Sequence, residues 1–207
     1  MGIQLLDLLL SVYNLQVRPV IVLFAKAPIP GRVKTRLCPP LTPQQAADLH
    51  LQFTFGMLEK LRSLHDIASV ELHTDVHCDA WQNLGVTVRL QCEGNLADRM
   101  LHAFREVGTP SMIVGSDAPG LPLEYLREML ASTSDVTLGP TEDGGYYAIA
   151  CRVDPPALMF DGVRWSSTHT LADTIHAVEA CGLTCGFGPE WWDIDSPEDL
   201  ARWRASR

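Results

Sequence analysis

The chain has 207 residues, a length that fits one domain with at most a short appendage. Hydrophobic residues make up 46% of it, which is enough apolar material for the core of a globular protein. The formal net charge of −9 argues against nucleic acid or an anionic membrane as the main partner.

The first 17 residues, "MGIQLLDLLLSVYNLQV", are apolar but too short and too interrupted to cross a membrane, because Asp7 lies in their middle. We expect an amphipathic helical extension over residues 1–17 that docks on the domain or on a second copy of the chain in a homodimer. A single domain should follow over residues 18–207. The six cysteines form no C-x-x-C pair, as expected of reduced thiols in a cytoplasmic protein.

Strand-like and helix-like segments alternate along the rest of the chain. We expect strands at 19–24, 69–75, 86–91, 111–117, 135–140, 145–150 and 183–187, and helices at 41–64, 95–107, 121–130, 167–182 and 196–205. Thr42 with Gln45 and Ser196 with Asp199 have the spacing of helix-capping boxes. Such alternation predicts an α/β fold, a three-layer sandwich around a mostly parallel twisted sheet.

A cationic loop follows the first expected strand. The stretch "FAKAPIPGRVKTRL" holds Lys26, Arg32, Lys34 and Arg36, with Gly31 among them. Ligands of parallel α/β sheets bind at the carboxyl ends of the strands, and lysine, arginine and exposed backbone amides are what a phosphate chain requires. The loop therefore favours phosphate binding, although it lacks the P-loop pattern. A basic loop that merely faces solvent is the alternative.

Acidic residues dominate the other end of the chain, where fifteen lie between residues 111 and 199. Asp117, in "GSDAPGLP", comes directly after an apolar strand on the same edge as the cationic loop. One carboxylate of this kind suits Mg²⁺, which takes one or two protein carboxylates and completes its shell with phosphate and water. An Asp that only stabilises a turn is the competing interpretation.

Three further stretches could contribute to a site. In "WWDIDSPEDL" we expect Asp193 and Asp195 to point to opposite sides, and Asp195 alone could simply stabilise the following helix. In "GPTEDGGYYAIA" the glycines indicate either a hairpin turn or a backbone that approaches a second substrate, with Glu142 or Asp143 contacting its polar groups. Arg99 lies at the start of a helix, where it could reach a base or a phosphate or lie on the surface.

A Ser/Thr cluster, "RWSSTHT", precedes the helix expected at 167–182. We interpret Trp165 as a packing residue and Thr168 as the helix cap. The absence of a G-x-S-x-G motif argues against a serine hydrolase.

Five ordered motifs, "FAKAPIPGRVKTRL", "GSDAPGL", "GPTEDGGYYAIA", "WSST" and "DIDSPEDL", resemble the bacterial DUF2064 proteins. The likeness covers residues 20–203 and implies a GT-A-like, nucleotide-diphospho-sugar transferase fold. The opening loop is similar to that of 2-phospho-lactate guanylyltransferases, and the last motif is similar to the end motif of sugar-acid cytidylyltransferases. The glycine-rich opening of sugar nucleotidyltransferases is absent, and Asp117 does not begin the D-x-D of many glycosyltransferases, because Pro119 stands where the second Asp would be.

The resemblance implies that Asp117 and Asp195 share Mg²⁺ or Mn²⁺ and that Arg99 contacts the nucleotide. Together with the cationic loop, it gives Lys34, Asp117 and Asp195 as the expected catalytic residues. The residues that we expect to bind the nucleotide and its phosphates are Lys26, Gly31, Arg32, Lys34, Arg36 and Arg99. Those that the glycine-containing stretch leads us to expect at the acceptor are Asp143, Gly144, Gly145 and Tyr146.

Three functions are consistent with these patterns. The first is an Mg²⁺-dependent nucleotidyltransferase that moves a nucleoside monophosphate from a triphosphate to a small phosphorylated acceptor and releases pyrophosphate. The second is a glycosyltransferase that uses a nucleoside-diphosphate sugar. The third is a protein that binds a nucleotide without turnover, with the N-terminal extension as its partner-docking element.

Overall fold

The computed structural model describes residues 17–206, so residues 1–16 of the expected N-terminal extension lie outside it. The strands are β1 Val20–Phe24, β2 Ser69–Thr74, β3 Thr87–Leu90, β4 Ser111–Gly115, β5 Val136–Pro140, β6 Tyr146–Cys151 and β7 Cys185–Phe187. The α-helices are α2 Pro43–Arg62, α3 Leu96–Val107, α4 Leu123–Ala131, α5 Thr170–Ala180 and α6 Pro197–Ala205. Every strand and α-helix expected within this range is therefore present. Three short 3-10 helices were not expected: η1 Thr35–Leu37, η2 Asp79–Trp81 and η3 Ala157–Phe160.

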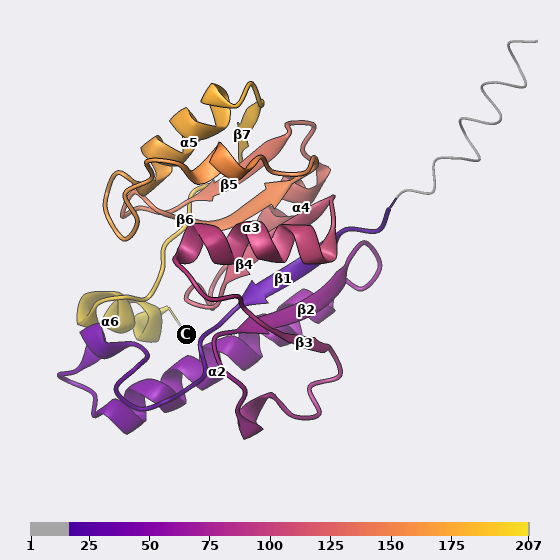
Figure 1. The fold of residues 1–207 in the computed structure, drawn as a ribbon. Coiled ribbons are helices and arrows are strands. Elements are labelled where there is room, and N and C mark those ends of the chain that lie inside the picture. The colour runs from indigo at the N-terminus through magenta and orange to yellow at the C-terminus, as the bar shows by residue number, and fades with distance from the viewer. Residues whose placement is uncertain (1–16, 207) are drawn as a thin grey trace, which may run out of the picture.

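The strands form one seven-stranded sheet in the order β3-β2-β1-β4-β6-β5-β7 (Figure 1). Only β6 runs antiparallel to its neighbours β4 and β5, so the prediction of a mostly parallel sheet is confirmed. From β1 the chain proceeds outward through β2 and β3 and then returns to place β4 on the other side of β1. Such a reversal between neighbouring parallel strands opens a crevice at their carboxyl ends, which is where α/β folds bind ligands.

Helices cover both faces of the sheet, as the three-layer prediction requires. Ile21 and Leu23 of β1 pack in a cluster with α2 and α4, while Val22 packs in a second cluster with α3 and α5. Alternate residues of one strand thus enter two different cores, because side chains of an extended chain alternate between its faces. This two-sided burial explains the continuous apolar run of β1.

The last helix packs away from these two cores, beside the segment that leads into α2 (Figure 1). Ile194 and Leu200 form a third buried cluster with Leu37 of η1 and Phe53 of α2. The rings of Phe53 and Trp203 meet edge to face with their centroids 4.9 Å apart. This cluster brings the C-terminal segment against the cationic loop.

Local sequence signals place most helix ends correctly. Thr42 with Gln45 and Ser196 with Asp199 form complete capping boxes, as expected. The prediction of Thr168 as the cap of α5 is wrong, because the helix begins at Thr170 and the preceding residues form a separate turn with Thr170 NH donating to Ser167 O at 3.1 Å. Within residues 17–206 no helix is long and apolar enough to cross a membrane.

Candidate active site

A cavity of about 760 Å³ opens at the carboxyl ends of β1 and β4, where the strand order reverses. Its charged lining residues are Lys26, Arg32, Lys34, Arg36, Arg99, Asp117, Asp143, Asp193 and Asp195. Nearly all the side chains expected at a site from the sequence therefore share one cavity. Gly31 and Gly144 are the two expected site residues that are not among its lining residues.

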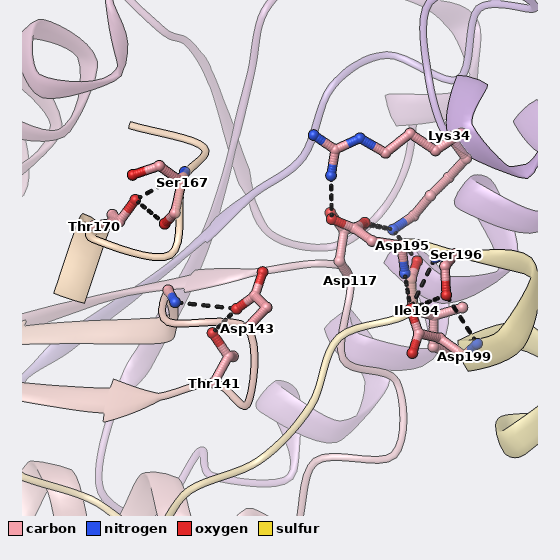
Figure 2. A network of polar contacts seen from close by, with 12 residues as sticks. Lys34, Asp117, Thr141, Asp143, Ser167, Thr170, Ile194, Asp195, Ser196 and Asp199 are labelled. Carbon is pink, nitrogen blue, oxygen red and sulfur yellow. Dashed lines mark hydrogen bonds and ion pairs between the residues drawn. The ribbon is translucent and has the colours of Figure 1, made fainter. Parts of the chain in front are cut away.

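Lys34 lies between the two carboxylates expected to share a metal (Figure 2). Its Nζ is 2.8 Å from Asp117 Oδ1 and 2.9 Å from Asp195 Oδ1, and it donates to the carbonyl oxygen of Ile194 at 2.6 Å. The side chain is only 4% exposed. Burial by itself would lower the pKa of Lys34, but the two carboxylates outweigh it and raise that pKa above its ordinary value. The ammonium is therefore charged and fully paired.

The backbone at Lys34 is held in an unusual conformation. Lys34 precedes η1 with φ 48° and ψ 35°, in the left-handed region that non-glycine residues seldom adopt. A conformation of this kind costs about 1 kcal/mol or more and persists where the surrounding structure imposes it. Here the ion pairs of the side chain and the burial of Leu37 in the third cluster hold the turn in place.

Asp117 follows β4 by two residues and projects into the cavity. Its Oδ1 is inaccessible to solvent, whereas the side chain as a whole is 41% exposed, so the second oxygen faces the cavity. Burial would raise the pKa of Asp117, but the Lys34 ammonium lowers it below its ordinary value. Asp117 is consequently an ionised carboxylate with one free oxygen.

Asp193 and Asp195 both line the cavity, so the expectation that they point to opposite sides is wrong. Residues two apart in an extended segment share a face, and it is Ile194 between them that turns into the third buried cluster. Asp193 Oδ1 is buried without a hydrogen-bond partner among the described residues. Burial, together with the charges of Asp117 and Asp195, raises the pKa of Asp193 to about 7.

The other cations of the loop have different partners. Arg36 Nη1 lies 3.6 Å from Asp195 Oδ2, and its side chain is exposed. Arg32 Nη2 lies 3.3 Å from Asp75 Oδ2, while Asp75 Oδ1 accepts a 2.7 Å hydrogen bond from Ala27 NH. Lys26 is exposed at the cavity.

Gly31 contributes to the loop turn rather than to the cavity wall. Its φ of +78° lies in the region that favours glycine, and a Cβ there would meet nothing within 4 Å. The reason for a glycine at this position is thus backbone conformation, not a close approach of another group.

A second wall of the cavity comes from the β5–β6 hairpin and from the turn before α5 (Figure 2). Asp143 Oδ1 accepts from Thr141 Oγ1 at 2.6 Å and from Gly145 NH at 3.0 Å. Gly145 and Tyr146 line the cavity, and burial raises the pKa of the Tyr146 hydroxyl. The glycine pair therefore lies in a hairpin turn, and Gly145 also borders the cavity.

Gly144 joins these two segments. Its φ is +86°, and a Cβ there would lie 2.3 Å from the carbonyl oxygen of Thr168. The carbonyl of Gly144 accepts a 2.9 Å hydrogen bond from Leu171 NH at the start of α5. Only glycine allows this contact, which fixes the Ser/Thr turn against the hairpin.

Arg99 occupies the first turn of α3 and lines the cavity. Its Nε donates to Gly94 O at 3.1 Å and its Nη1 donates to Gln91 Oε1 at 3.3 Å. Asn95 and Asp98 form a capping box that starts this helix. The guanidinium is thus positioned at the mouth of the cavity by local contacts.

The sequence did not point to several lining residues. Trp165 packs on Phe160 with ring centroids 5.7 Å apart, as expected of a packing residue, but it also borders the cavity. Ser166, Ser167 and Thr168 line it as well, because α5 starts later than the sequence indicated. His50 is 4% exposed, its Nε2 lies 2.8 Å from Lys26 O, and burial lowers its pKa. The sequence around a buried histidine inside a helix does not indicate that it borders a cavity.

Comparison with known proteins shows which family the chain belongs to. The model of the family described as "Uncharacterized protein conserved in bacteria (DUF2064)" matches residues 59–167, more than half of the chain. A search of curated proteins gave no match. The matched region contains Arg99, Asp117 and Asp143, whereas the cationic loop and Asp195 lie outside it.

Solved structures share the fold. A protein from Desulfovibrio desulfuricans G20, described as a candidate nucleotide-diphospho-sugar transferase, is 30% identical, with 92% of this chain and 88% of that chain covered and a TM-score of 0.83. The bifunctional IspDF from Campylobacter jejuni is 14% identical, with 89% of this chain and 53% of that chain covered and a TM-score of 0.54. A hypothetical transferase from Thermus thermophilus is 15% identical, with 89% and 100% covered and a TM-score of 0.51. At these low identities, the last two structures show only that the fold is shared. The chain belongs to the DUF2064 family and has the fold of the nucleotide-diphospho-sugar transferases.

Proposed function

We propose that the protein is a divalent-cation-dependent nucleotidyltransferase, which moves a nucleoside monophosphate from a nucleoside triphosphate to a small phosphorylated acceptor and releases pyrophosphate. One observation carries the proposal. Five basic residues, Lys26, Arg32, Lys34, Arg36 and Arg99, line the same cavity as Asp117 and Asp195. Cations for a phosphate chain and carboxylates for its metal thus lie together at the strand ends.

The loop after β1 would hold the phosphates of the donor. Lys26 and Arg36 are exposed at the cavity, and a triphosphate needs more positive charge than a diphosphate. Lysine acts as a point charge, while arginine donates two parallel hydrogen bonds to one phosphate group. Binding of this kind would orient the α-phosphate toward the acceptor and neutralise the leaving pyrophosphate.

The donor set fits Mg²⁺ or Mn²⁺. Within residues 17–206 there is no cluster of three or more His, Cys, Asp or Glu side chains suited to a metal, but Mg²⁺ commonly needs only one or two carboxylates besides phosphate and water. Oδ1 of Asp117 and Oδ1 of Asp195 both lie within 2.9 Å of one cationic atom, Lys34 Nζ. Two carboxylates that converge on a cation are the ligands this ion requires. A metal held there would stabilise negative charge on the reacting phosphates.

The second wall would receive the acceptor. Asp143 offers a carboxylate oxygen, and Ser166, Ser167 and Thr168 offer hydroxyl and backbone groups near the start of α5. Backbone amides at a helix start are suited to a phosphate, and Arg99 supplies a cation at the cavity mouth. These groups would position a phosphorylated acceptor for attack on the α-phosphate.

A second candidate is a glycosyltransferase that uses a nucleoside-diphosphate sugar. Two observations favour it. The similar protein from Desulfovibrio desulfuricans is described as a candidate nucleotide-diphospho-sugar transferase, and the second wall combines hydroxyls, Asp143 and the Trp165 ring with no lysine or arginine among its described lining residues. Hydroxyl, carboxylate and aromatic groups suit a sugar as well as a phosphate ester.

Thermal shift against each nucleoside triphosphate and a panel of nucleoside-diphosphate sugars, with and without Mg²⁺, tests the proposal. A ligand at 100 times its dissociation constant stabilises the folded state by about 2.7 kcal/mol. A metal-dependent shift with a triphosphate, followed by pyrophosphate release when acceptors are added, is the expected result. A shift only with a diphosphate sugar, and free diphosphate as product, would favour the glycosyltransferase. Binding without turnover for any acceptor would favour the non-catalytic alternative.

A further inference from the structure

The ammonium of Lys34 already has three polar partners. Its Nζ donates hydrogen bonds to Asp195 Oδ1 at 2.9 Å and to the carbonyl oxygen of Ile194 at 2.6 Å, and it forms an ion pair with Asp117 Oδ1 at 2.8 Å. The side chain is 4% exposed, so a phosphate would have to displace one of these partners to reach the ammonium. In this state Lys34 binds the carboxylates rather than the nucleotide.

The proposed function asks for a different arrangement of the same three side chains. Asp117 and Asp195 would hold the metal with the oxygens that now hold Lys34, and Lys34 would contact a phosphate. The Asp117 Oδ1 and Asp195 Oδ1 atoms already contact the ammonium, and a second cation on these same two oxygens would be repelled by it strongly in a partly buried site. A metal on these two oxygens would therefore compete with the ammonium for them.

We propose that the Lys34 ammonium and a divalent cation are alternative occupants of one cation site formed by Asp117 and Asp195. In the metal-free protein Lys34 is the counter-ion that lies between the two carboxylates. When a divalent cation takes its place, the long flexible side chain is released into the cavity that Lys34 lines. The released ammonium is then available to the donor phosphates, and this last step rests on the proposed function.

The exchange makes metal and nucleotide binding mutually reinforcing. A metal that frees Lys34 raises the affinity for phosphate, and by linkage a phosphate that captures Lys34 raises the affinity for the metal by the same factor. Without the metal, a nucleotide would have to compete with two carboxylates for Lys34. The other loop cations, exposed Lys26 and Arg36, are not subject to this competition to the same degree.

The lysine content of the chain allows a direct test without nucleotide. Lys26, Lys34 and Lys60 are the only lysines in the sequence, so the protein labelled with ¹⁵N-lysine should give at most three side-chain ammonium signals in an NMR spectrum. Buried, hydrogen-bonded ammonium groups exchange slowly and should be visible. Lys34 qualifies, and Lys60, which donates to Pro119 O and Leu121 O, is an internal reference. The variants Lys26→Met and Lys60→Met assign the signals by elimination even if Lys34→Met does not fold.

We expect titration with Mg²⁺ alone to shift or remove the Lys34 signal while the Lys60 signal stays. A Lys34 signal unchanged at a Mg²⁺ concentration that calorimetry shows to be saturating would overturn the proposal. So would the failure of the wild-type protein to bind Mg²⁺ or Mn²⁺ at all. The readout involves no nucleotide, so a positive result followed by no nucleotide binding would remove the proposed function and leave the exchange intact.

Affinity for Mn²⁺, measured by electron paramagnetic resonance, gives a second readout. Lys34→Met should bind Mn²⁺ at least about tenfold more tightly than the wild type, since the competing cation is gone. Lys26→Met removes the same charge from the same loop without vacating the carboxylates, and its affinity should change by about threefold or less. Equal gains in the two variants would indicate general electrostatics and would overturn the exchange.

Discussion

The backbone NH of Ile194 donates a hydrogen bond to the carbonyl oxygen of Asp117 at 3.0 Å. This bond ties the segment after β4 to the segment before α6, although the two are far apart in the sequence. Asp117 and Asp195 are thereby held beside each other, and Ile194 presents its carbonyl oxygen to the same Lys34 ammonium. The candidate cation site thus depends on two backbone segments in fixed register as well as on its side chains.

Replacement of Lys34 should slow turnover strongly. We expect Lys34→Ala to lower the rate of pyrophosphate release by about 100-fold or more, a loss typical of removing one group that stabilises transition-state charge. Arg127→Ala serves as a control, because Arg127 pairs with Asp66 in an exposed ion pair and should change the rate little. An unchanged rate in Lys34→Ala would contradict the proposed role.

The capping box of α6 should matter for the site as well as for stability. We expect Ser196→Ala to lower the free energy of unfolding by about 1 kcal/mol and also to weaken Mn²⁺ binding, because Ser196 and Asp199 fix the chain next to Asp195. Thr42→Ala removes the equivalent box of α2 and should cost a similar free energy with Mn²⁺ affinity unchanged. Urea unfolding and Mn²⁺ titration measure the two effects. Equal Mn²⁺ affinities in the two variants would show that the box does not position Asp195.

Stability of the metal-free protein should depend on pH through Asp193. The pKa of Asp193 is raised to about 7 in the folded state from about 3.8, so the folded state holds this proton more tightly than the unfolded state. The contribution of Asp193 to stability is therefore fully present below about pH 4 and is lost as the pH rises through 7. We expect Asp193→Asn to remove this pH-dependent loss of stability, because the amide does not titrate.

Urea unfolding in the presence of a chelator tests the pH dependence. We expect Asp193→Asn to exceed the wild type in free energy of unfolding at pH 8 by about 1 to 4 kcal/mol, with the difference shrinking toward pH 4. A difference that is constant across this range would exclude Asp193 as the titrating group.

Gly144 should be far less replaceable than other glycines with positive φ. Gly144→Ala places a Cβ 2.3 Å from Thr168 O, whereas Gly182→Ala, at a φ of +74°, meets nothing within 4 Å. We expect Gly182→Ala to cost about 1 kcal/mol from backbone strain and Gly144→Ala to cost at least about 2 kcal/mol more. Thermal unfolding compares the two. If the costs are equal, the contact with Thr168 adjusts freely and does not fix the second wall.

Local patterns in the sequence were sufficient for the elements and for part of the site. The apolar runs of β1 and β4 indicate buried parallel strands, and the capping boxes at Thr42 and Ser196 mark helix starts, because these signals involve neighbours in the chain. The rule that ligands bind at the carboxyl ends of such strands then brings the cationic loop and Asp117 to one edge. The resemblance to a family was needed to include Asp195 among the expected metal ligands, because an acid just before a helix can be explained by its stabilising effect on that helix.

Only the tertiary structure decided how these residues are paired. The third buried cluster carries the C-terminal segment to the loop, and this contact between distant segments makes Lys34 a partner of Asp117 and Asp195. The raised pKa of Asp193 likewise depends on burial and on the charges of Asp117 and Asp195. The sequence by itself therefore determined which elements form and which residue types reach the strand ends, because strand and helix signals are local. Which cation neutralises which carboxylate was decided by packing, because burial and electrostatic contact depend on distances that arise only when the chain has folded.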